Sequence, residues 1–249
     1  MFRFPSVLVF IVAVFVTASG YADTVTFQYG VNSYTGVQDT FLESDAPGSH
    51  MGTLSPYMYV GYSSSAVMRG LIRFDLSSLT GQYVTITEVK LHLTTGGTSA
   101  SLSNTLGLYE VASSNAAWGE STATWNTLNG TTAWTGGGGL GTTGYGSLLA
   151  SAPVNAASSS VEWTISDPTT ATNLVNDFVS GANEGFLIKA QNETFSGSDN
   201  WIRFVQATSG SPNVSLQVTY SVPEPKAWGL LVSALLALAF HRRRRLADV

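Results

Sequence analysis

Aromatic side chains are the residues of this sequence best suited to hold a ligand. The apolar C–H face of a sugar ring stacks on an indole or phenol ring, while its hydroxyls take part in hydrogen bonds with polar side chains. Large aromatics also dominate the cores of β-sandwiches, so a core position is the open alternative for each of them. Trp134, beside a glycine-rich loop, is the best candidate for an exposed ring, whereas Trp125 and Trp163 follow strand patterns and are expected in the core. The candidate carbohydrate-binding residues are Tyr57, Tyr59, Trp118, Trp134 and Trp201.

Two aspartates offer oxygen ligands for a cation. Asp39 and Asp75 fall in expected strands, where carboxylates and backbone carbonyls together could ligate a structural Ca²⁺. No continuous Asp-x-Asp loop accompanies them, and Arg73 beside Asp75 offers an ion pair on a sheet face as the alternative. Calcium is therefore a hypothesis, and no other cofactor is indicated.

Residues that could carry catalysis are few. His50 lies in an expected loop and His92 on a strand face, and neither has a partner at metal-ligand spacing. The nucleophile elbow G-x-S-x-G and the zinc motif H-E-x-x-H are both absent from the sequence. The chain has no cysteine, which excludes thiol nucleophiles, cysteine-bound zinc and iron–sulfur clusters.

Paired carboxylates could hydrolyse a glycoside if they flanked one glycosidic bond. Glu43 with Asp45, and Glu184 with Glu193, are the candidate pairs, but we expect solvated loop acids at these positions. Glu120 follows Trp-Gly, where hydrogen bonds to backbone or hydroxyl groups are expected to fix a turn; contact with a ligand is the alternative. These residues favour a non-catalytic protein, with a polysaccharide lyase or glycoside hydrolase as the alternative.

The body of the chain, residues 23–222, is strongly acidic. It has five basic and 14 acidic residues, a net charge of −9, compared with −5 for the full sequence. Phosphate backbones would repel such a surface, so nucleic acid is excluded as a partner, and metal cations are more suitable. With about 200 residues, the body can build one domain with a substantial core without disulfides.

Short strands must position these side chains, because the hydrophobic pattern of the body mostly has a period of two. The alternation slips by one residue near Thr87 and Glu88, which predicts a bulge or tight bend there. Many short strands separated by turn residues indicate a β-sandwich or jelly roll. The expected strands are residues 25–28, 37–42, 57–62, 71–76, 84–87, 89–93, 106–111, 161–165, 185–189, 201–206 and 214–220.

One helix and one long loop interrupt the strands. Asp167 and Pro168 supply a cap and a first-turn proline, an apolar stripe follows over residues 174–179, and Gly181 ends the segment. The Gly/Thr-rich residues 131–146 lack the Lys-Ser/Thr of a phosphate-binding loop, so we expect a flexible loop.

The N-terminal segment has the features of a secretory signal peptide. Arg3 supplies a positive charge, residues 7–16 are an unbroken apolar run, and small residues follow at the cleavage position. Cleavage is expected after Ala22, with Gly20 as the second choice. The apolar run is too short to span a bilayer, which needs about 20 residues.

The C-terminal segment has three parts in a characteristic order. A Pro-Glu-Pro motif precedes an apolar stretch at residues 227–240, and an arginine cluster follows. This order resembles the PEP-CTERM sorting signal, which implies processing by an exosortase-type membrane protease and delivery to the cell surface or matrix. Arginines resist translocation and would stay cytoplasmic, whereas the short helix would act as a transient inner-membrane anchor; a permanent anchor is the alternative. The motif is Val222, Pro223, Glu224 and Pro225, and the cluster is Arg242, Arg243, Arg244 and Arg245.

The body resembles the DNRLRE family, which is related to disaggregatase repeats and to certain alginate-binding modules. The resemblance rests on three stretches at residues 39–79, 118–126 and 161–220, which include Arg69-Gly-Leu-Ile-Arg-Phe-Asp and Trp118-Gly-Glu. It implies a jelly-roll sandwich, in agreement with the strand pattern. It also implies a surface or matrix protein, and some family members bind polysaccharides.

Together these features predict an all-β protein with a single jelly-roll-type β-sandwich and one short helix. The expected division is a signal peptide at residues 1–22, the DNRLRE-like domain at 23–222 and the sorting signal at 223–249. We expect an exported, non-catalytic cell-surface or extracellular-matrix protein that binds exopolysaccharide in biofilms or flocs. Signal peptidase and an exosortase-type protease are its expected processing partners.

Overall fold

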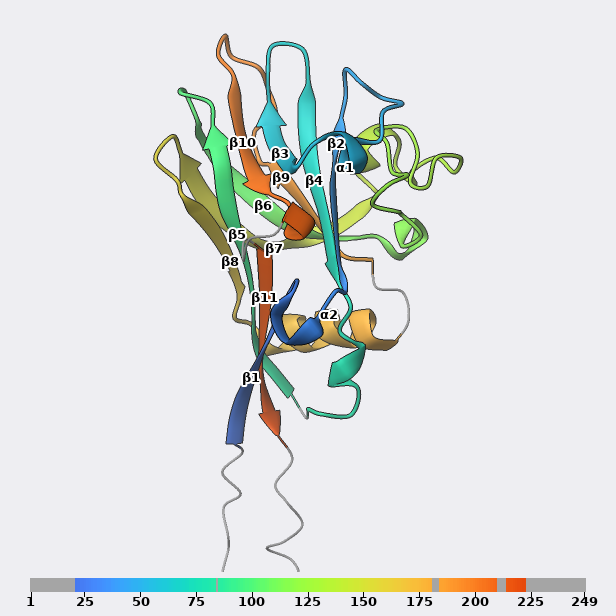
Figure 1. Cartoon of the computed structure of the whole chain (residues 1–249), viewed down its shortest axis with the longest axis vertical. Helices are drawn as coiled ribbons and strands as arrows, with labels where there is room; N and C mark the ends of the chain where they lie inside the picture. Colours follow the sequence, from blue (N-terminus) through green and yellow to red (C-terminus); the bar gives the residue numbers. More distant parts are fainter. Residues whose placement is uncertain (1–20, 84, 181–183, 210–213, 223–249) are drawn as a thin grey trace, which may run out of the picture. The chain divides into compact units, whose positions relative to one another are not determined.

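Eleven β-strands dominate the residues that the computed structural model describes, 21–83, 85–180, 184–209 and 214–222 (Figure 1). Residues 22–222 form a compact unit of their own. The strands are β1 (Tyr21–Gln28), β2 (Val37–Glu43), β3 (Tyr57–Tyr62), β4 (Val67–Phe74), β5 (Thr85–Thr98), β6 (Ser103–Val111), β7 (Tyr145–Asn155), β8 (Ser160–Ile165), β9 (Phe186–Ala190), β10 (Asn200–Val205) and β11 (Val214–Val222).

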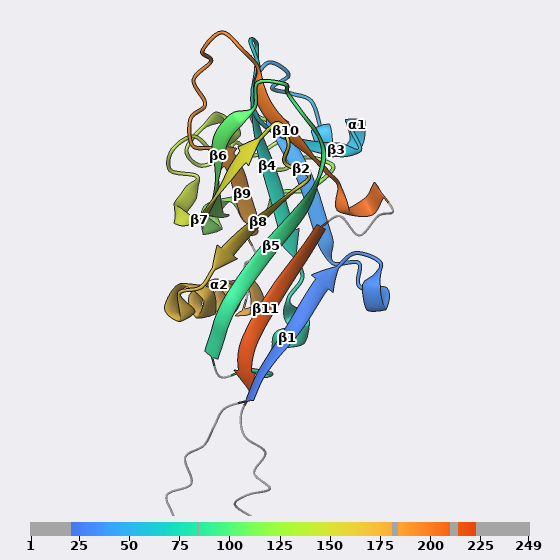
Figure 2. The same cartoon turned by 90° about the vertical axis from the view of Figure 1, so that its left-hand side faces the viewer.

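These strands hydrogen-bond into one sheet that curls back on itself. Its order is β1-β11-β5-β10-β3-β4-β9-β6-β7, with β2 added to β4 and β8 added to β5. Figure 2 shows β8, β5, β11 and β1 side by side in one layer. The curl brings the two layers together across the core, where Trp163 of β8 donates its indole N–H to the Leu106 carbonyl of β6 at 3.1 Å. The predicted all-β sandwich is confirmed.

The long strand β5 contains the predicted irregularity. Against β11, Glu88 pairs with Thr219 but Ile86 pairs with Tyr220, so Thr87 is the extra residue of a β-bulge. The predicted slip near Thr87 and Glu88 is therefore confirmed. The far end of β5 leaves β11 and pairs with β10.

Two apolar cores result from the alternation of side chains along the strands. The larger core fills the space between the layers, with Phe41, Ile72 and Ile188 among its members. Their sequence neighbours Leu42, Leu71 and Leu187 point to the opposite face and form a second, smaller core. The long segment between β6 and β7 covers this second core with the side chains of Trp118, Ala123, Leu128, Trp134 and Leu140.

Helix α2 (Pro168–Ser180) is the predicted helix, and its N-terminus is capped as expected. The Asp167 carboxylate accepts the Thr170 backbone N–H at 2.7 Å. Two elements were not predicted: the four-residue helix α1 (Met51–Leu54) and β7. The β7 sequence is rich in Gly, Ser and Ala, and the strand sits at the edge of the sheet, so it has little of the usual strand pattern.

The predicted processing segments lie mostly outside the described residues. Residues 1–20 and 223–249, which include the apolar run of the signal peptide, the Pro-Glu-Pro residues and the arginine cluster, are not described. β1 begins at Tyr21, so cleavage after Ala22 would remove its first two residues, whereas cleavage after Gly20 would retain the whole strand. No helix within the described part of the chain has the length and hydropathy needed to cross a membrane.

Candidate functional site

Three of the predicted aromatic residues meet on the outer face of β3 and β10. Arg203 pairs with Tyr59 across these strands, and Trp201 pairs with Gly61. Side chains two residues apart in a strand share a face, so Tyr57, Tyr59, Trp201 and Arg203 lie together. The intervening residues, among them Ile202 and Phe204, point into the main core. We call these four half-buried residues the planar platform.

Arg203 contacts both tyrosines of the planar platform. Its guanidinium carbon lies 4.3 Å from the centre of the Tyr57 ring and 6.0 Å from that of Tyr59. Nη1 donates a hydrogen bond to the Tyr59 hydroxyl at 3.1 Å, and Nε donates to the Gly96 carbonyl at 3.0 Å. The Trp201 ring extends the series, with its centre 5.6 Å from that of Tyr59. Four planar groups thus lie side by side on one sheet face.

Two glycines in β5 make space for this arrangement. A Cβ atom on Gly96 would come within 2.5 Å of the Tyr57 ring, and one on Gly97 within 3.0 Å of Arg203 Nε. Gly97 also has a φ of +147°, which side-chain-bearing residues rarely adopt. Backbone alone lies beneath the Tyr57 and Arg203 side chains, so these can lie flat.

Arg203 has no acidic partner among the described residues. The ion pairs found there join Arg69 and Lys189 to Glu193, and Lys90 to Glu88. The guanidinium therefore keeps unused donors beside the aromatic rings. Such a surface can stack on an apolar ring face and donate hydrogen bonds to the oxygens at its edge.

Trp118 and Trp134 do not belong to this surface. Their exposed fractions are 1% and 3%, and both pack into the second core. Each indole N–H donates to a backbone carbonyl, Trp118 to Glu184 at 2.7 Å and Trp134 to Thr124 at 2.8 Å. The expectation of a sugar-stacking role for these two rings is corrected, because neither ring has a free face. Trp163 is in the core as predicted, and Trp125 is half-buried.

The two predicted calcium ligands lie in different environments. Asp39 is buried, and its Oδ2 accepts the Ala207 backbone N–H at 2.8 Å. Burial raises the pKa of Asp39 to about 7, and the nearby Glu120 carboxylate adds to the rise. Asp75 is exposed and accepts the Ser77 backbone N–H at 2.9 Å. As they stand, no three histidine, aspartate or glutamate side chains in the described ranges are arranged to hold a metal ion.

Other polar residues are used to hold the structure together. Arg73 does not pair with Asp75; it donates to the Gln38 side chain and to the Ala116 carbonyl, and its guanidinium lies 4.6 Å from the Trp118 ring centre. Burial raises the pKa of Glu120, and the Asp39 backbone and the Arg73 charge lower it, so Glu120 lies close to β2 and β4.

Two of the expected loop acids are not solvated. Glu193 accepts from Arg69 at 2.6 Å and 2.8 Å and lies 3.6 Å from the Lys189 ammonium group, and Glu184 has an exposed fraction of only 6%. Arg69, which pairs with the Glu193 carboxylate, and Trp118, which donates to the Glu184 backbone carbonyl, are distant in the sequence, so local sequence patterns could not show these contacts.

Arg203 is the residue of the planar platform that the site prediction missed. Its spacing of two from Trp201 within one strand was the available signal, because it puts both side chains on the same face. The sequence could not show that Arg203 pairs with Tyr59 across β10 and β3.

Comparison with known families supports a carbohydrate-binding domain. The model of carbohydrate-binding module family 96 matches residues 31–183. The chain belongs to this family. This membership supports carbohydrate binding by the domain and fits a non-catalytic protein. The match includes Tyr57 and Tyr59 and ends before Trp201 and Arg203. No curated protein matches the chain.

Proposed function

We propose that the planar platform binds exopolysaccharide and that the protein is an exported, non-catalytic component of the cell surface or extracellular matrix. The observation that carries the binding site is the row of contacts that joins Tyr57, Arg203, Tyr59 and Trp201 on one sheet face, in which the Tyr59 and Trp201 rings are tilted by 57° to each other. The matched family supports a carbohydrate as the ligand.

The geometry of the planar platform fits an extended glycan better than a small molecule. The half-buried rings of β3 and β10 also pack in part against the main core, and their exposed parts form a row of surfaces over which a glycan chain can pass. The pre-stacked guanidinium reduces the side-chain entropy that binding would cost. Its free donors favour a glycan rich in accessible oxygens.

The proposed destination rests on the two ends of the sequence. The charged, apolar and small-residue segments of residues 1–22 have the order of a signal peptide that signal peptidase removes. The Pro-Glu-Pro motif, short apolar segment and arginine cluster would hold the protein briefly in the inner membrane, with the arginines in the cytoplasm. An exosortase-type protease would then release the domain to the surface or matrix, where it would contribute to biofilms or flocs.

Affinity electrophoresis and calorimetry with neutral, uronate-containing and host exopolysaccharides test the binding site. Trp201→Ala and Tyr57→Ala should abolish retardation by the glycan that the parent protein binds, since each removes a stacking surface. Tyr83→Ala is the matched control. Tyr83 is a partly buried aromatic that bonds to Asn176 of α2, away from β3 and β10, and its loss should leave retardation unchanged.

Retention of full affinity by both platform variants would place the binding surface elsewhere. The absence of retardation and heat with every glycan would contradict the function itself. Release of reducing ends or of unsaturated products from the same polysaccharides would favour the lyase or hydrolase alternative.

A further inference from the structure

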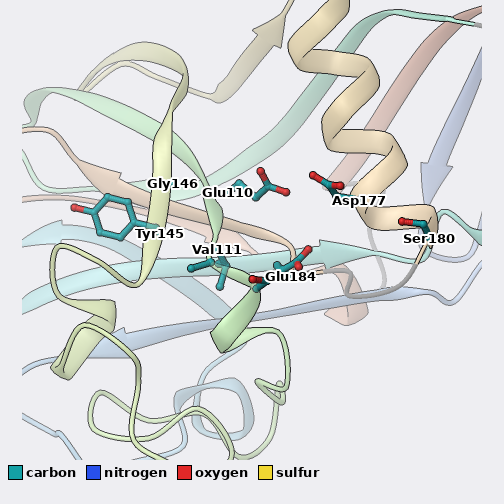
Figure 3. Close-up of a pocket in the computed structure, with 9 residues that line it drawn as sticks. Glu110, Val111, Tyr145, Gly146, Asp177, Ser180 and Glu184 are labelled. Atoms are coloured by element: carbon teal, nitrogen blue, oxygen red, sulfur yellow. The ribbon is translucent and has the colours of Figure 1, made fainter.

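A second site lies far from the planar platform in the strand order, in a cleft of about 490 Å³ beside β6, β7 and α2. Three carboxylates from separate parts of the chain line it: Glu110 of β6, Asp177 of α2 and Glu184 ahead of β9. Figure 3 shows the Glu110 and Asp177 carboxylates turned toward each other, with the Glu184 carboxylate facing the same space. No lysine, arginine or histidine is among the described residues that line the cleft.

The end of helix α2 makes the cleft more negative. Asp177 lies in the last turn of α2, which contains no basic residue. The carbonyl groups of the final turn give a helix C-terminus a partial negative charge, so a carboxylate there is unfavourable and a cation is favourable. Helix C-termini usually carry basic residues, whereas this one has an acidic residue close to two more carboxylates. A bound cation would neutralise part of this negative charge.

Glu184 supplies an independent indication of a ligand. Its exposed fraction is 6%, and its Oε2 has no hydrogen-bond partner within the described residues. A buried carboxylate oxygen without a partner costs free energy, and such groups normally meet a donor or a cation. The backbone around it is held in place, because the Trp118 indole donates to the Glu184 carbonyl and the Val111 N–H donates to the Gly185 carbonyl.

The strands are irregular where the cleft opens. Tyr109 pairs with Leu148 and Val111 with Tyr145, so β7 has one extra residue opposite Glu110. Gly146 is part of this bulge and lines the cleft without a side chain to fill it. Bulges commonly redirect a side chain at a binding site. Here the bulge leaves Glu110 facing open space.

We propose that this cleft binds Ca²⁺ through the carboxylates of Glu110, Asp177 and Glu184. These are hard oxygen ligands, as Ca²⁺ prefers, and backbone carbonyls and water would complete the coordination. Within the described residues no three such side chains are placed to hold an ion together, so the Glu110 and Asp177 carboxylates, which already face each other, would move closer to Glu184 as the ion binds. Flexible coordination of this kind suits Ca²⁺ better than Mg²⁺, which demands a nearly ideal octahedron.

Two of the carboxyl groups that line the cleft have raised pKa values. Burial raises the pKa of Glu110 to about 7, and the Asp177 and Glu184 charges add to the rise. Burial also raises the pKa of Glu184. The other groups at the cleft are Ser113, Ser180 and Tyr145, and Lys189 above the Tyr145 ring is paired with Glu193 outside the lining.

Calorimetry and thermal unfolding of the full chain, first stripped with EDTA, test the proposal. The parent should bind Ca²⁺ with a dissociation constant of about 10⁻⁴ to 10⁻³ M, as other extracellular modules do, and its melting temperature should rise. E110Q and D177N should each weaken binding at least about tenfold. E162Q, which removes an exposed acid on β8, is the matched control and should bind as the parent does.

D177N distinguishes a binding role from a structural one, because the difference in melting temperature between variant and parent should change sign when Ca²⁺ is added. In EDTA it should melt at the same temperature as the parent or higher, because it removes repulsion at the helix end. In 5 mM CaCl₂ it should melt below the parent. The proposal is overturned if Ca²⁺ gives neither heat nor a melting shift, if E110Q and D177N respond to Ca²⁺ as the parent does, or if D75N alone removes the response.

Discussion

The guanidinium of Arg203 combines two properties that no other side chain provides. It is planar, so it stacks on the Tyr57 ring, and it donates in fixed directions to the Tyr59 hydroxyl and the Gly96 carbonyl. A lysine would keep the charge but lose the stacking and the fork of donors. The role of this residue therefore depends on shape as well as on charge.

Arg203→Lys tests that distinction. We expect glycan affinity to fall about tenfold or more while the melting temperature changes little, because the pairing of β3 and β10 through their backbones is unaffected. Calorimetry against the glycan that the parent binds measures the effect. Arg69→Lys is the control, since Arg69 is paired with Glu193 on another surface. Equal affinity of Arg203→Lys and the parent would show that charge alone suffices.

The buried carboxyl group of Asp39 predicts how stability depends on pH. Its pKa is about 7 in the folded protein, well above the ordinary value near 4, because burial disfavours the charged form. Between these values the unfolded chain loses the proton and the folded protein keeps it. The free energy of unfolding therefore decreases as the pH rises from about 4 to 7, by up to about 1.4 kcal/mol per pH unit from this group.

Asp39→Asn should flatten this dependence. The amide oxygen can still accept the Ala207 N–H, and nothing ionises at this position. Urea unfolding of parent and variant at pH 5 and pH 8, both in EDTA, measures the difference. Glu110 contributes a slope of the same sign, so some dependence should remain in the variant. An identical slope in the two proteins would contradict the raised pKa of Asp39.

The segment between β6 and β7 is an element in its own right, although it is almost free of regular structure. It covers the outer face of β2, β4 and β9, and its Trp134 and Leu140 side chains are buried against Leu71 and Leu187. The glycine-rich part was predicted to be a flexible loop with an exposed tryptophan. A high glycine content indicates that the unfolded chain is flexible. It does not show that the neighbouring apolar residues pack against the second face of the sheet in the folded protein.

Trp134→Ala should reveal this packing. A buried tryptophan lost from a core costs about 3–5 kcal/mol, and here the donor to the Thr124 carbonyl is lost as well. Trp201 is half-buried, so Trp201→Ala should lower the free energy of unfolding less than Trp134→Ala does. It should lower the affinity for the glycan more. Urea unfolding and glycan calorimetry on both variants separate the two roles. A smaller loss of stability from Trp134→Ala than from Trp201→Ala would contradict the second core.

Most strands could be predicted because local patterns determine them. β3 has the expected limits, and the slip at Thr87 gave the bulge its correct position. The site depended on information of a different kind. Tyr59 and Arg203 meet through a strand register that joins residues 144 apart in sequence. The carboxylates of Glu110 and Asp177 line the same cleft because the fold brings the end of α2 near Glu110 of β6, and no sequence spacing indicates this.

For the whole molecule, the sheet determines where the domain ends lie. β1 and β11 are neighbours, and the first residue of β1 and the last residue of β11 lie at the same end of the domain (Figures 1 and 2). The proposed tail would leave the domain at this end. Segments attached to the ends of a domain can be removed without interrupting its core.

Residues 22–222 should therefore fold without the flanking segments. Among the described residues, the buried members of the main core lie between Phe27 and Tyr220, and the second core lies within the same limits. Because the fragment keeps both cores, we expect its free energy of unfolding to differ from that of the full chain by no more than about 0.5 kcal/mol. In a domain of this size such a difference changes the melting temperature by at most about 2 °C. Tryptophan fluorescence during heating measures it, with the same glycan and Ca²⁺ titrations repeated on the fragment. A large loss of stability would mean that the flanking segments contribute to the fold. Loss of glycan binding alone would place part of the binding surface in those segments.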